Sequence, residues 1–154
     1  MGAALAVIER RGRVLISRRR RGGFLGGYWE FPGGKRDPGE SWEACLRREL
    51  REELGVSVAG IRPLCRLRYR YPGRPAFVFQ VFRCRIVRGR PRPLEASALR
   101  WVARKALPRY RFPPANRPLL ERLSTAGPMG PAVDAEPGRY RIGPAKRPTT
   151  RRPK

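Results

Sequence analysis

Residues 41–55 constrain the fold most, because their apolar residues repeat at the period of an α-helix. Projected at about 100° per residue, one face carries Trp42, Cys45, Leu46, Leu50 and Leu54. Ser41 is a preferred N-cap residue, and Gly55 suits the left-handed position that ends a helix. The sequence therefore predicts an amphipathic helix that begins after Ser41, runs to about Leu54 and packs against other elements.

Three glutamates of this helix lie where acids are disfavoured. Glu49, Glu52 and Glu53 fall in its last turns, and the partial negative charge there costs each of them about 0.3–1 kcal/mol. Glu53 projects inside the apolar stripe and the other two lie along its edge, whereas ordinary surface glutamates would point away from it. Carboxylates at this spacing repel one another unless cations compensate them. Oxygen ligands suit Mg²⁺, with Mn²⁺ as an alternative.

The composition narrows the chemistry further. The chain has no histidine among its 154 residues, so Ser-His-Asp and Cys-His mechanisms are excluded, and a carboxylate is the natural general base near neutral pH. Its three cysteines are too scattered for a disulfide framework and are expected to be reduced and buried. A net charge of +24 indicates either attraction to polyanions or a compositional bias towards arginine.

The remaining chain alternates short apolar segments with turns. Strands are expected at 3–8, 14–17, 28–31, 61–70, 76–87 and 99–103, and a last helix at about 118–124. Pro32, Gly33 and Gly34 are expected to break any regular element. We expect one domain over 1–124, followed by a basic tail rich in Pro, Gly and Arg over 125–154, disordered or weakly bound to nucleic acid. We expect a cytoplasmic monomer without a membrane segment.

The helix and the loop before it also match a known pattern. Gly34, Glu40 and the run from Arg48 to Val56 agree with every fixed position of the Nudix box, GX5EX7REUXEEXGU, in which U is apolar. The chain thus resembles the Nudix hydrolases, which cleave a nucleoside diphosphate linked to a variable group. The resemblance implies an α+β fold, with a mixed β-sheet sandwiched between α-helices in α/β/α layers.

The resemblance also implies roles for the residues of the box. Glu49, Glu52 and Glu53 would hold the metal, assisted by a backbone carbonyl near Gly33. Arg48 would orient these carboxylates. The structural positions of the motif would be Gly34, which allows a tight turn, Glu40, which braces the loop–helix junction, and Gly55.

The flanking segments resemble the MutT branch, the 8-oxo-dGTP diphosphatases, at 29–35 and 112–116. By this resemblance Asn116 would hydrogen-bond the oxidised purine edge, although a helix-capping role is the alternative. Phe31 would offer an aromatic face, or else be a buried strand residue. Tyr71 resembles the second aromatic residue of the branch, and Arg19 its ligand-contacting arginine, within a run of four arginines that leaves the register open. Lys35 and Arg19 could also contact phosphate.

A further glutamate completes the expected site. Glu95 lies six residues before Trp101 and is the only acid between Glu53 and Glu121. Either Glu53 or Glu95 would deprotonate the water that attacks the β-phosphorus of a nucleoside triphosphate.

Three functions follow from these features. The leading hypothesis is an Mg²⁺-dependent pyrophosphohydrolase that sanitises oxidised purine nucleotides. One alternative is a hydrolase of pyrimidine triphosphates or of another nucleoside diphosphate derivative. The other is a non-catalytic module that reads oxidised bases or nucleic acid, as in the C-terminal domain of adenine glycosylases. Those domains typically lose box carboxylates, which this chain keeps.

Overall fold

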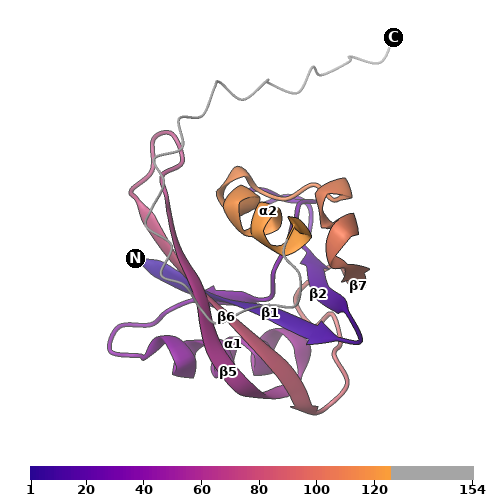
Figure 1. Ribbon diagram of the computed structural model, residues 1–154. Coiled ribbons are helices and arrows are strands. Elements are labelled where there is room, and N and C mark those ends of the chain that lie inside the picture. The colour runs from indigo at the N-terminus through magenta and orange to yellow at the C-terminus, as the bar shows by residue number, and fades with distance from the viewer. Residues whose placement is uncertain (126–154) are drawn as a thin grey trace.

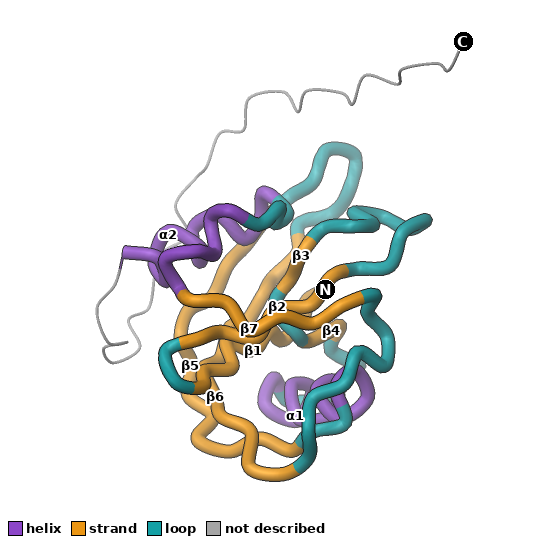
Figure 2. Tube along the Cα trace, turned by 90° about the vertical axis from the view of Figure 1, so that its right-hand side faces the viewer, coloured by secondary structure: helices purple, strands orange, loops and turns teal. Residues whose placement is uncertain are grey.

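The structure, a computed structural model, describes residues 1–125, and most of the predicted basic tail lies outside the described residues. Figures 1 and 2 show one sheet with helices on its two sides. The elements are β1 (Gly2–Arg10), β2 (Arg13–Arg18), β3 (Trp29–Glu30), β4 (Gly33–Lys35), α1 (Trp42–Leu54), β5 (Ser57–Tyr69), β6 (Phe77–Arg88), β7 (Ala98–Ala103), the 3₁₀ helices η1 (Arg104–Arg109) and η2 (Pro114–Asn116), and α2 (Arg117–Thr125). No helix among these residues is long and apolar enough to cross a membrane.

The sheet is mixed, as the sequence predicts. Its order is β3-β2-β1-β6-β5, with β4 added to β1 and β7 added to β2. β1 and β6 run parallel, whereas the other pairs are antiparallel. β1 lies at the centre because Gly2–Ile8 are buried without interruption, which is typical of a strand covered on both faces.

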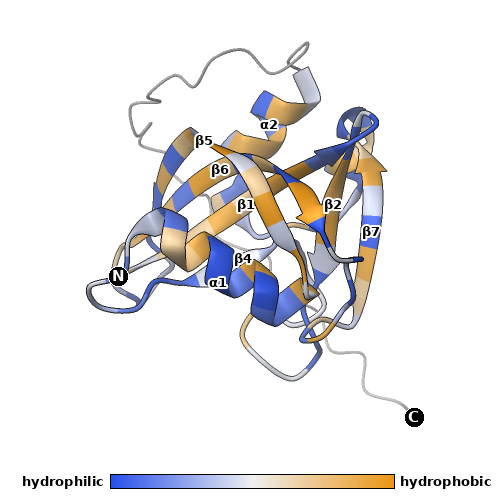
Figure 3. Cartoon of the chain, turned by 90° about the horizontal axis from the view of Figure 1, so that it is seen from below, coloured by the Kyte–Doolittle hydropathy of each residue, from blue (hydrophilic) through white to orange (hydrophobic). Residues whose placement is uncertain are grey.

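The two faces of the sheet are covered by different helices. Successive residues of a strand point to opposite faces, so Ala4, Ala6 and Ile8 pack in the core under α1, whereas Leu5 and Val7 pack in the core under α2. The buried residues of α1 are Cys45, Leu46, Leu50 and Leu54, as predicted. Figure 3 shows the hydrophobic character of β1 where it passes α1. These layers confirm the α/β/α arrangement.

Local signals place the ends of α1. The Ala44 N–H donates to Ser41 Oγ at 3.1 Å, and Gly55 takes the left-handed conformation with φ of 70°. The Gly55 N–H donates to the Arg51 carbonyl at 3.0 Å, which satisfies one of the carbonyls left unpaired at a helix end. The predicted boundaries of this helix are therefore confirmed.

The prediction that Pro32–Gly34 breaks any regular element is wrong for its second half. Residues 33–35 form β4, which pairs with β1 through Leu5 opposite Gly33 and Ala3 opposite Lys35. Gly33 has φ of +147°, and a Cβ there would overlap the Ala4 carbonyl oxygen. Two glycines can join a strand through their backbone alone, so no side-chain pattern announces it.

Two further elements differ from expectation. β5 begins at Ser57 and not at 61, and η1 over Arg104–Arg109 was not predicted. The early part of β5 contains register shifts between Ala59 and Arg62 and between Pro63 and Cys65. These irregularities interrupt the alternation of apolar and polar residues on which a strand prediction rests.

Candidate active site

Glu53 is the centre of a cluster of carboxylates. It projects from the last turn of α1, and its Oε2 accepts a hydrogen bond of 3.0 Å from the Gly33 backbone N–H of β4. Burial, followed by the charges of Glu30, Glu49 and Glu95, raises the pKa of Glu53 from its ordinary 4.5 to about 8, although the Gly33 bond lowers it. Carboxylates from three different parts of the fold thus face one another.

Arg48 compensates the neighbouring acids through a planar fork. Its Nε and Nη2 donate to the two oxygens of Glu40 at 2.7 and 2.9 Å, and its Nη1 donates to Glu49 at 2.8 Å and Glu52 at 3.2 Å. The bonds that Glu40 accepts, chiefly those from Arg48 and also one from the Asp37 backbone, lower the pKa of Glu40 to about 2. Through these bonds Glu40 connects the loop before α1 to the helix.

Glu53 receives no such compensation. In the part of the chain that the structure describes, the ion pairs of Arg48 go to Asp37, Glu40, Glu49 and Glu52. Neither Glu53 nor Glu95 has an ion pair with Lys or Arg in residues 1–125. Buried negative charge without a partner is costly, so this cluster has an unmet need for cations.

Backbone contacts place the loop that carries Glu95. The Leu94 N–H donates to the Glu53 carbonyl at 3.1 Å, and the Arg92 N–H donates to the Leu54 carbonyl at 3.0 Å. Both acceptors are carbonyls at the end of α1, which have no partner within the helix. The exposed Glu95 is thereby brought close enough to raise the pKa of Glu49 and of Glu53.

Glu30 belongs to the same cluster, although sequence reasoning assigned it no role. It lies on β3, and its Oε2 accepts from Arg19 Nη1 at 3.1 Å. Burial raises the pKa of Glu30, whereas Arg19 lowers it. The signal that could have found it is the motif at 29–35, which contains this acid directly before Phe31.

Gly34 leaves room for one of the expected metal ligands. A Cβ at this position would overlap the Glu49 carboxylate. The Gly34 carbonyl lies 3.4 Å from the Cys45 Sγ of α1, which joins β4 to the helix a second time. The glycine is thus required by close packing against Glu49.

The chemistry of the cluster fits a divalent cation. Its donors are carboxylate and carbonyl oxygens, which hard cations such as Mg²⁺ and Mn²⁺ prefer, and the uncompensated charge around Glu53 would be neutralised by one. Among residues 1–125, however, no three acidic side chains are arranged closely enough to hold a metal ion together. Arg48 donates to one oxygen each of Glu49 and Glu52, and the Gly33 N–H donates to one oxygen of Glu53.

A second group of predicted residues lies beside the cluster. Burial and the neighbouring Tyr69 raise the pKa of Tyr71 to about 12, while the Ala115 backbone and Arg19 lower it. Arg19 is therefore next to Tyr71 and also pairs with Glu30. Asn116 follows Ala115 directly and is 6% exposed. The structure thus brings Arg19, Tyr71 and Asn116 to one place, joined to the carboxylates through Glu30.

The position of Asn116 also fits its alternative role as a helix-capping residue. It ends η2 and directly precedes α2, where a helix cap would lie, and its backbone N–H donates to the Pro113 carbonyl at 3.0 Å. Both base recognition and capping therefore stay open for this side chain.

Phe31 and Lys35 occupy different environments. Phe31 is 1% exposed and packs against Phe112 with ring centroids 5.1 Å apart, so in this structure it is a core residue. Lys35 is exposed, and its carbonyl accepts from Arg48 Nη2 at 3.0 Å. The proposed contacts of Phe31 with a base and of Lys35 with phosphate remain predictions.

A mixed sheet between helices, with a cluster of glutamates at the end of α1, is typical of a hydrolase of phosphorylated compounds. The chain belongs to the Nudix family: residues 1–123 match the family described as "NUDIX domain". Nudix hydrolases act on nucleotide substrates and generally need a divalent metal.

Individual relatives support this membership. The 8-oxo-dGTP diphosphatase of Haemophilus influenzae is 36% identical over 73% of this chain and 82% of its own length. The CTP pyrophosphohydrolase of Escherichia coli is 33% identical over 82% of this chain and 93% of its own length. Among solved structures, a MutT Nudix hydrolase from Burkholderia pseudomallei is similar with a TM-score of 0.71 and 33% identity, covering 78% of this chain and 95% of that one.

Proposed function

We propose that this Nudix hydrolase is an Mg²⁺-dependent nucleoside triphosphate pyrophosphohydrolase that converts 8-oxo-dGTP to 8-oxo-dGMP and pyrophosphate. The observation that carries the proposal is the cluster of Glu30, Glu49, Glu53 and Glu95, in which Glu53 and Glu95 have no ion pair within residues 1–125. The similarity to the H. influenzae 8-oxo-dGTP diphosphatase supports the choice of substrate.

Glu49, Glu52, Glu53 and the Gly33 carbonyl would hold the cation. When bound, a divalent cation neutralises diphosphate charge and lowers the pKa of a water molecule. Carboxylate and carbonyl oxygens suit Mg²⁺ and Mn²⁺ alike, so Mg²⁺ is the proposed ion and Mn²⁺ its alternative. Arg48 acts as a positioning residue, since its fork fixes Glu49 and Glu52 relative to each other.

Glu53 or Glu95 would accept the proton of the attacking water. The water oxygen then forms a bond to the β-phosphorus, and the bond from that phosphorus to the oxygen shared with the α-phosphate breaks. The electron pair leaves with the nucleoside monophosphate, and the β- and γ-phosphates leave as pyrophosphate. Glu53 is half-buried and Glu95 is exposed, so the two candidates differ in their access to water.

Asn116, Tyr71 and Arg19 would select the base. The Asn116 amide carries both donors and an acceptor, as reading a purine edge requires. Its burial strengthens discrimination, because a wrong base would leave a buried polar group unpaired. The Tyr71 ring supplies an apolar surface, and Arg19 connects it to the carboxylate cluster.

A second substrate class is favoured by one observation. The E. coli CTP pyrophosphohydrolase is nearly as similar to this chain as the diphosphatase is, and over a longer stretch. We therefore propose hydrolysis of pyrimidine triphosphates as the alternative activity. The chemistry at the carboxylates would be the same, and only the contacts to the base would differ.

A panel of nucleotides separates the two substrates. Pyrophosphate release from 8-oxo-dGTP, dGTP, CTP and dCTP is measured with Mg²⁺ and with a chelator, and kcat/KM is compared. The proposal expects at least about tenfold preference for 8-oxo-dGTP over dGTP and no release with chelator. Preference for CTP or dCTP would support the alternative.

Three expectations from the sequence stay predictions: a cytoplasmic location, a monomeric state, and weak nucleic-acid binding through the tail at 125–154.

A further inference from the structure

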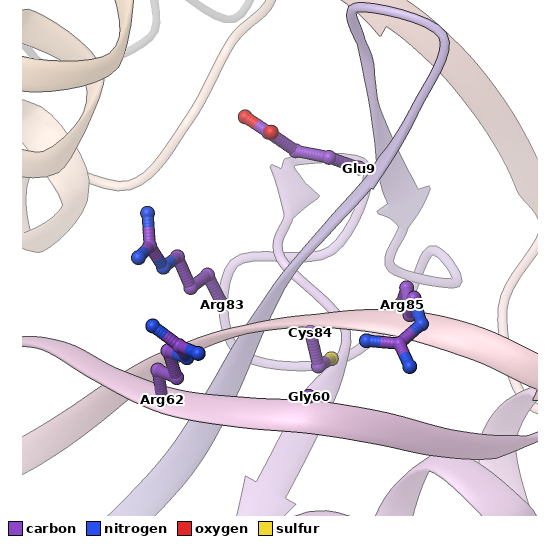
Figure 4. Close-up of a pocket in the computed structure, with 6 residues that line it drawn as sticks. All are labelled: Glu9, Gly60, Arg62, Arg83, Cys84 and Arg85. Carbon is purple, nitrogen blue, oxygen red and sulfur yellow. The ribbon is translucent and has the colours of Figure 1, made fainter. Parts of the chain in front are cut away.

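Three arginines gather around a hollow away from the carboxylate cluster. Arg62 of β5 and Arg83 and Arg85 of β6 line a cavity of about 320 Å³ together with Glu9, Gly60 and Cys84. Figure 4 shows the guanidinium groups of Arg62 and Arg83 on the same side of the two strands, with Arg85 beside Cys84.

The hollow is separate from the candidate active site. Cys84 lies opposite Ile8, towards the end of β1, whereas β4 pairs with Ala3–Leu5 at the beginning of that strand. Along β6, Phe82 and Cys84 pack in the core under α1, but Val81 packs in the core under α2. Alternation therefore places the Arg83 and Arg85 side chains on the face of the sheet opposite α1.

Two of the three arginines that line the hollow, Arg62 and Arg85, have no partner of opposite charge within residues 1–125. Arg62 and Arg83 are direct partners in the β5–β6 ladder, and like charges in this position destabilise a sheet. Glu9 is the one acid among the lining residues, and it also faces Arg104, with 3.9 Å between Oε1 and Nε. An anion would relieve this excess.

The backbone is shaped to place one of the guanidinium groups. Gly60 lies in the irregular part of β5, between Ala59, which is opposite Arg85, and Arg62. Its φ is +63°, and a Cβ would overlap Nη1 of Arg85. Glycine thus allows the Arg85 guanidinium to lie against the strand at the edge of the hollow.

We propose that this hollow binds a small oligophosphate anion of about the size of pyrophosphate. Guanidinium forks pair with phosphate oxygens through two parallel hydrogen bonds, and three arginines line this hollow. The cavity volume is at the lower end of small-ligand pockets, about 300–1,000 Å³, which favours a compact anion over an extended strand. The proposal does not depend on the hydrolytic function, because none of the lining residues belongs to that site.

Calorimetric titration of the full chain with pyrophosphate tests the proposal. Chelator removes divalent cations from the active site, and about 0.15 M salt suppresses diffuse attraction to the basic surface. The wild type is expected to bind pyrophosphate, and the Arg62→Ala/Arg85→Ala variant at least about tenfold more weakly. The control Arg51→Ala/Arg109→Ala, which removes two exposed charges elsewhere, should stay within about twofold. Nucleotide hydrolysis should be unchanged in both variants.

Further arms distinguish the source of the phosphate. The Arg62→Lys/Arg85→Lys variant keeps the charge but loses the forks, and it should bind pyrophosphate more weakly than the wild type. Equal affinity of the wild type and either double variant of Arg62 and Arg85 would overturn the proposal, as would no binding at all. A short single-stranded oligonucleotide that binds through these arginines, while pyrophosphate does not, would also overturn it and assign the hollow to a nucleic-acid backbone.

Discussion

The backbone N–H of Gly33 donates a hydrogen bond to Glu53 Oε2 across 3.0 Å, although the two residues are 20 positions apart. This bond ties β4 to the last turn of α1. It holds one oxygen of a half-buried carboxylate whose neighbours Glu30, Glu49 and Glu95 are also acids. The arrangement is stable only if protons or cations offset the repulsion, and this property leads to the predictions below.

Replacing Glu53 tests its chemical role. Glu53→Gln should lower kcat for pyrophosphate release by about 10²–10⁴, because the variant loses both a metal ligand and a candidate general base. The control is Glu43→Gln, at an exposed acid in the first turn of the same helix that pairs with Arg47, and it should keep its turnover. Full activity of Glu53→Gln would remove this residue from the mechanism.

The stability of the metal-free protein should depend on pH through the same residue. The folded state raises the pKa of Glu53 from 4.5 to about 8, so it favours the protonated form. The contribution of this group to stability is fully present below about pH 4.5 and is lost as the pH rises through about 8.

Urea unfolding in chelator measures this dependence. The free energy of unfolding of the wild type should fall relative to that of Glu53→Gln between pH 4.5 and 8, on the order of a few kcal/mol. Glu30 and Glu49 titrate in both proteins, so the difference reports Glu53 together with its coupling to these two acids. Parallel pH profiles would show that its carboxyl is not perturbed as described.

Gly34 should be necessary for the geometry of Glu49. A Cβ at Gly34 would overlap the Glu49 carboxylate, so Gly34→Ala should weaken Mg²⁺ binding about tenfold and destabilise the fold by about 1–3 kcal/mol. Gly23→Ala is the matched control, since a Cβ there meets no atom within 4 Å. Unchanged Mg²⁺ affinity in Gly34→Ala, measured by calorimetry, would exclude Glu49 as a ligand in this position.

Arg48 should not be replaceable by lysine. A lysine has three N–H donors and no planar fork, so it cannot make the four bonds that Arg48 donates to Glu40, Glu49 and Glu52. Arg48→Lys should therefore lower kcat about tenfold while the KM for nucleotide changes less. Arg47→Lys serves as the comparison, because its side-chain pair with Glu43 is exposed and contributes little. Equal kcat in the two variants would contradict a positioning role.

Asn116 offers a test between base recognition and helix capping. Asn116→Ser keeps a good capping side chain but loses the amide. Base recognition predicts that the preference for 8-oxo-dGTP over dGTP falls by about 10–100-fold in both Asn116→Ser and Asn116→Ala. Capping predicts that only Asn116→Ala loses stability, by about 1 kcal/mol, and that the preference stays in both.

Sequence reasoning succeeded where the signal is local. The N-cap at Ser41 and the left-handed Gly55 follow from propensities of single residues, and the apolar stripe of α1 follows from its period. The position of Glu53 inside this stripe already indicated that it is not an ordinary surface glutamate.

Other parts of the site depend on contacts between distant segments. β4 forms through the backbone of Gly33 and Gly34, which no side-chain pattern reveals. Glu30 joins the carboxylates only because β3 pairs with β2 and places it near Glu53. The hollow between β5 and β6 likewise requires the register that sets Arg62 opposite Arg83.

The most direct measurement is a calorimetric titration of the full chain with Mg²⁺ in the presence of a nonhydrolysable nucleoside triphosphate analogue, in the wild type and in Glu49→Gln and Glu53→Gln. If these carboxylates bind the cation, Mg²⁺ uptake should be saturable in the wild type, and the affinity for Mg²⁺ should fall at least about tenfold in each variant. No uptake beyond that of the free analogue, or equal uptake in all three proteins, would contradict the account.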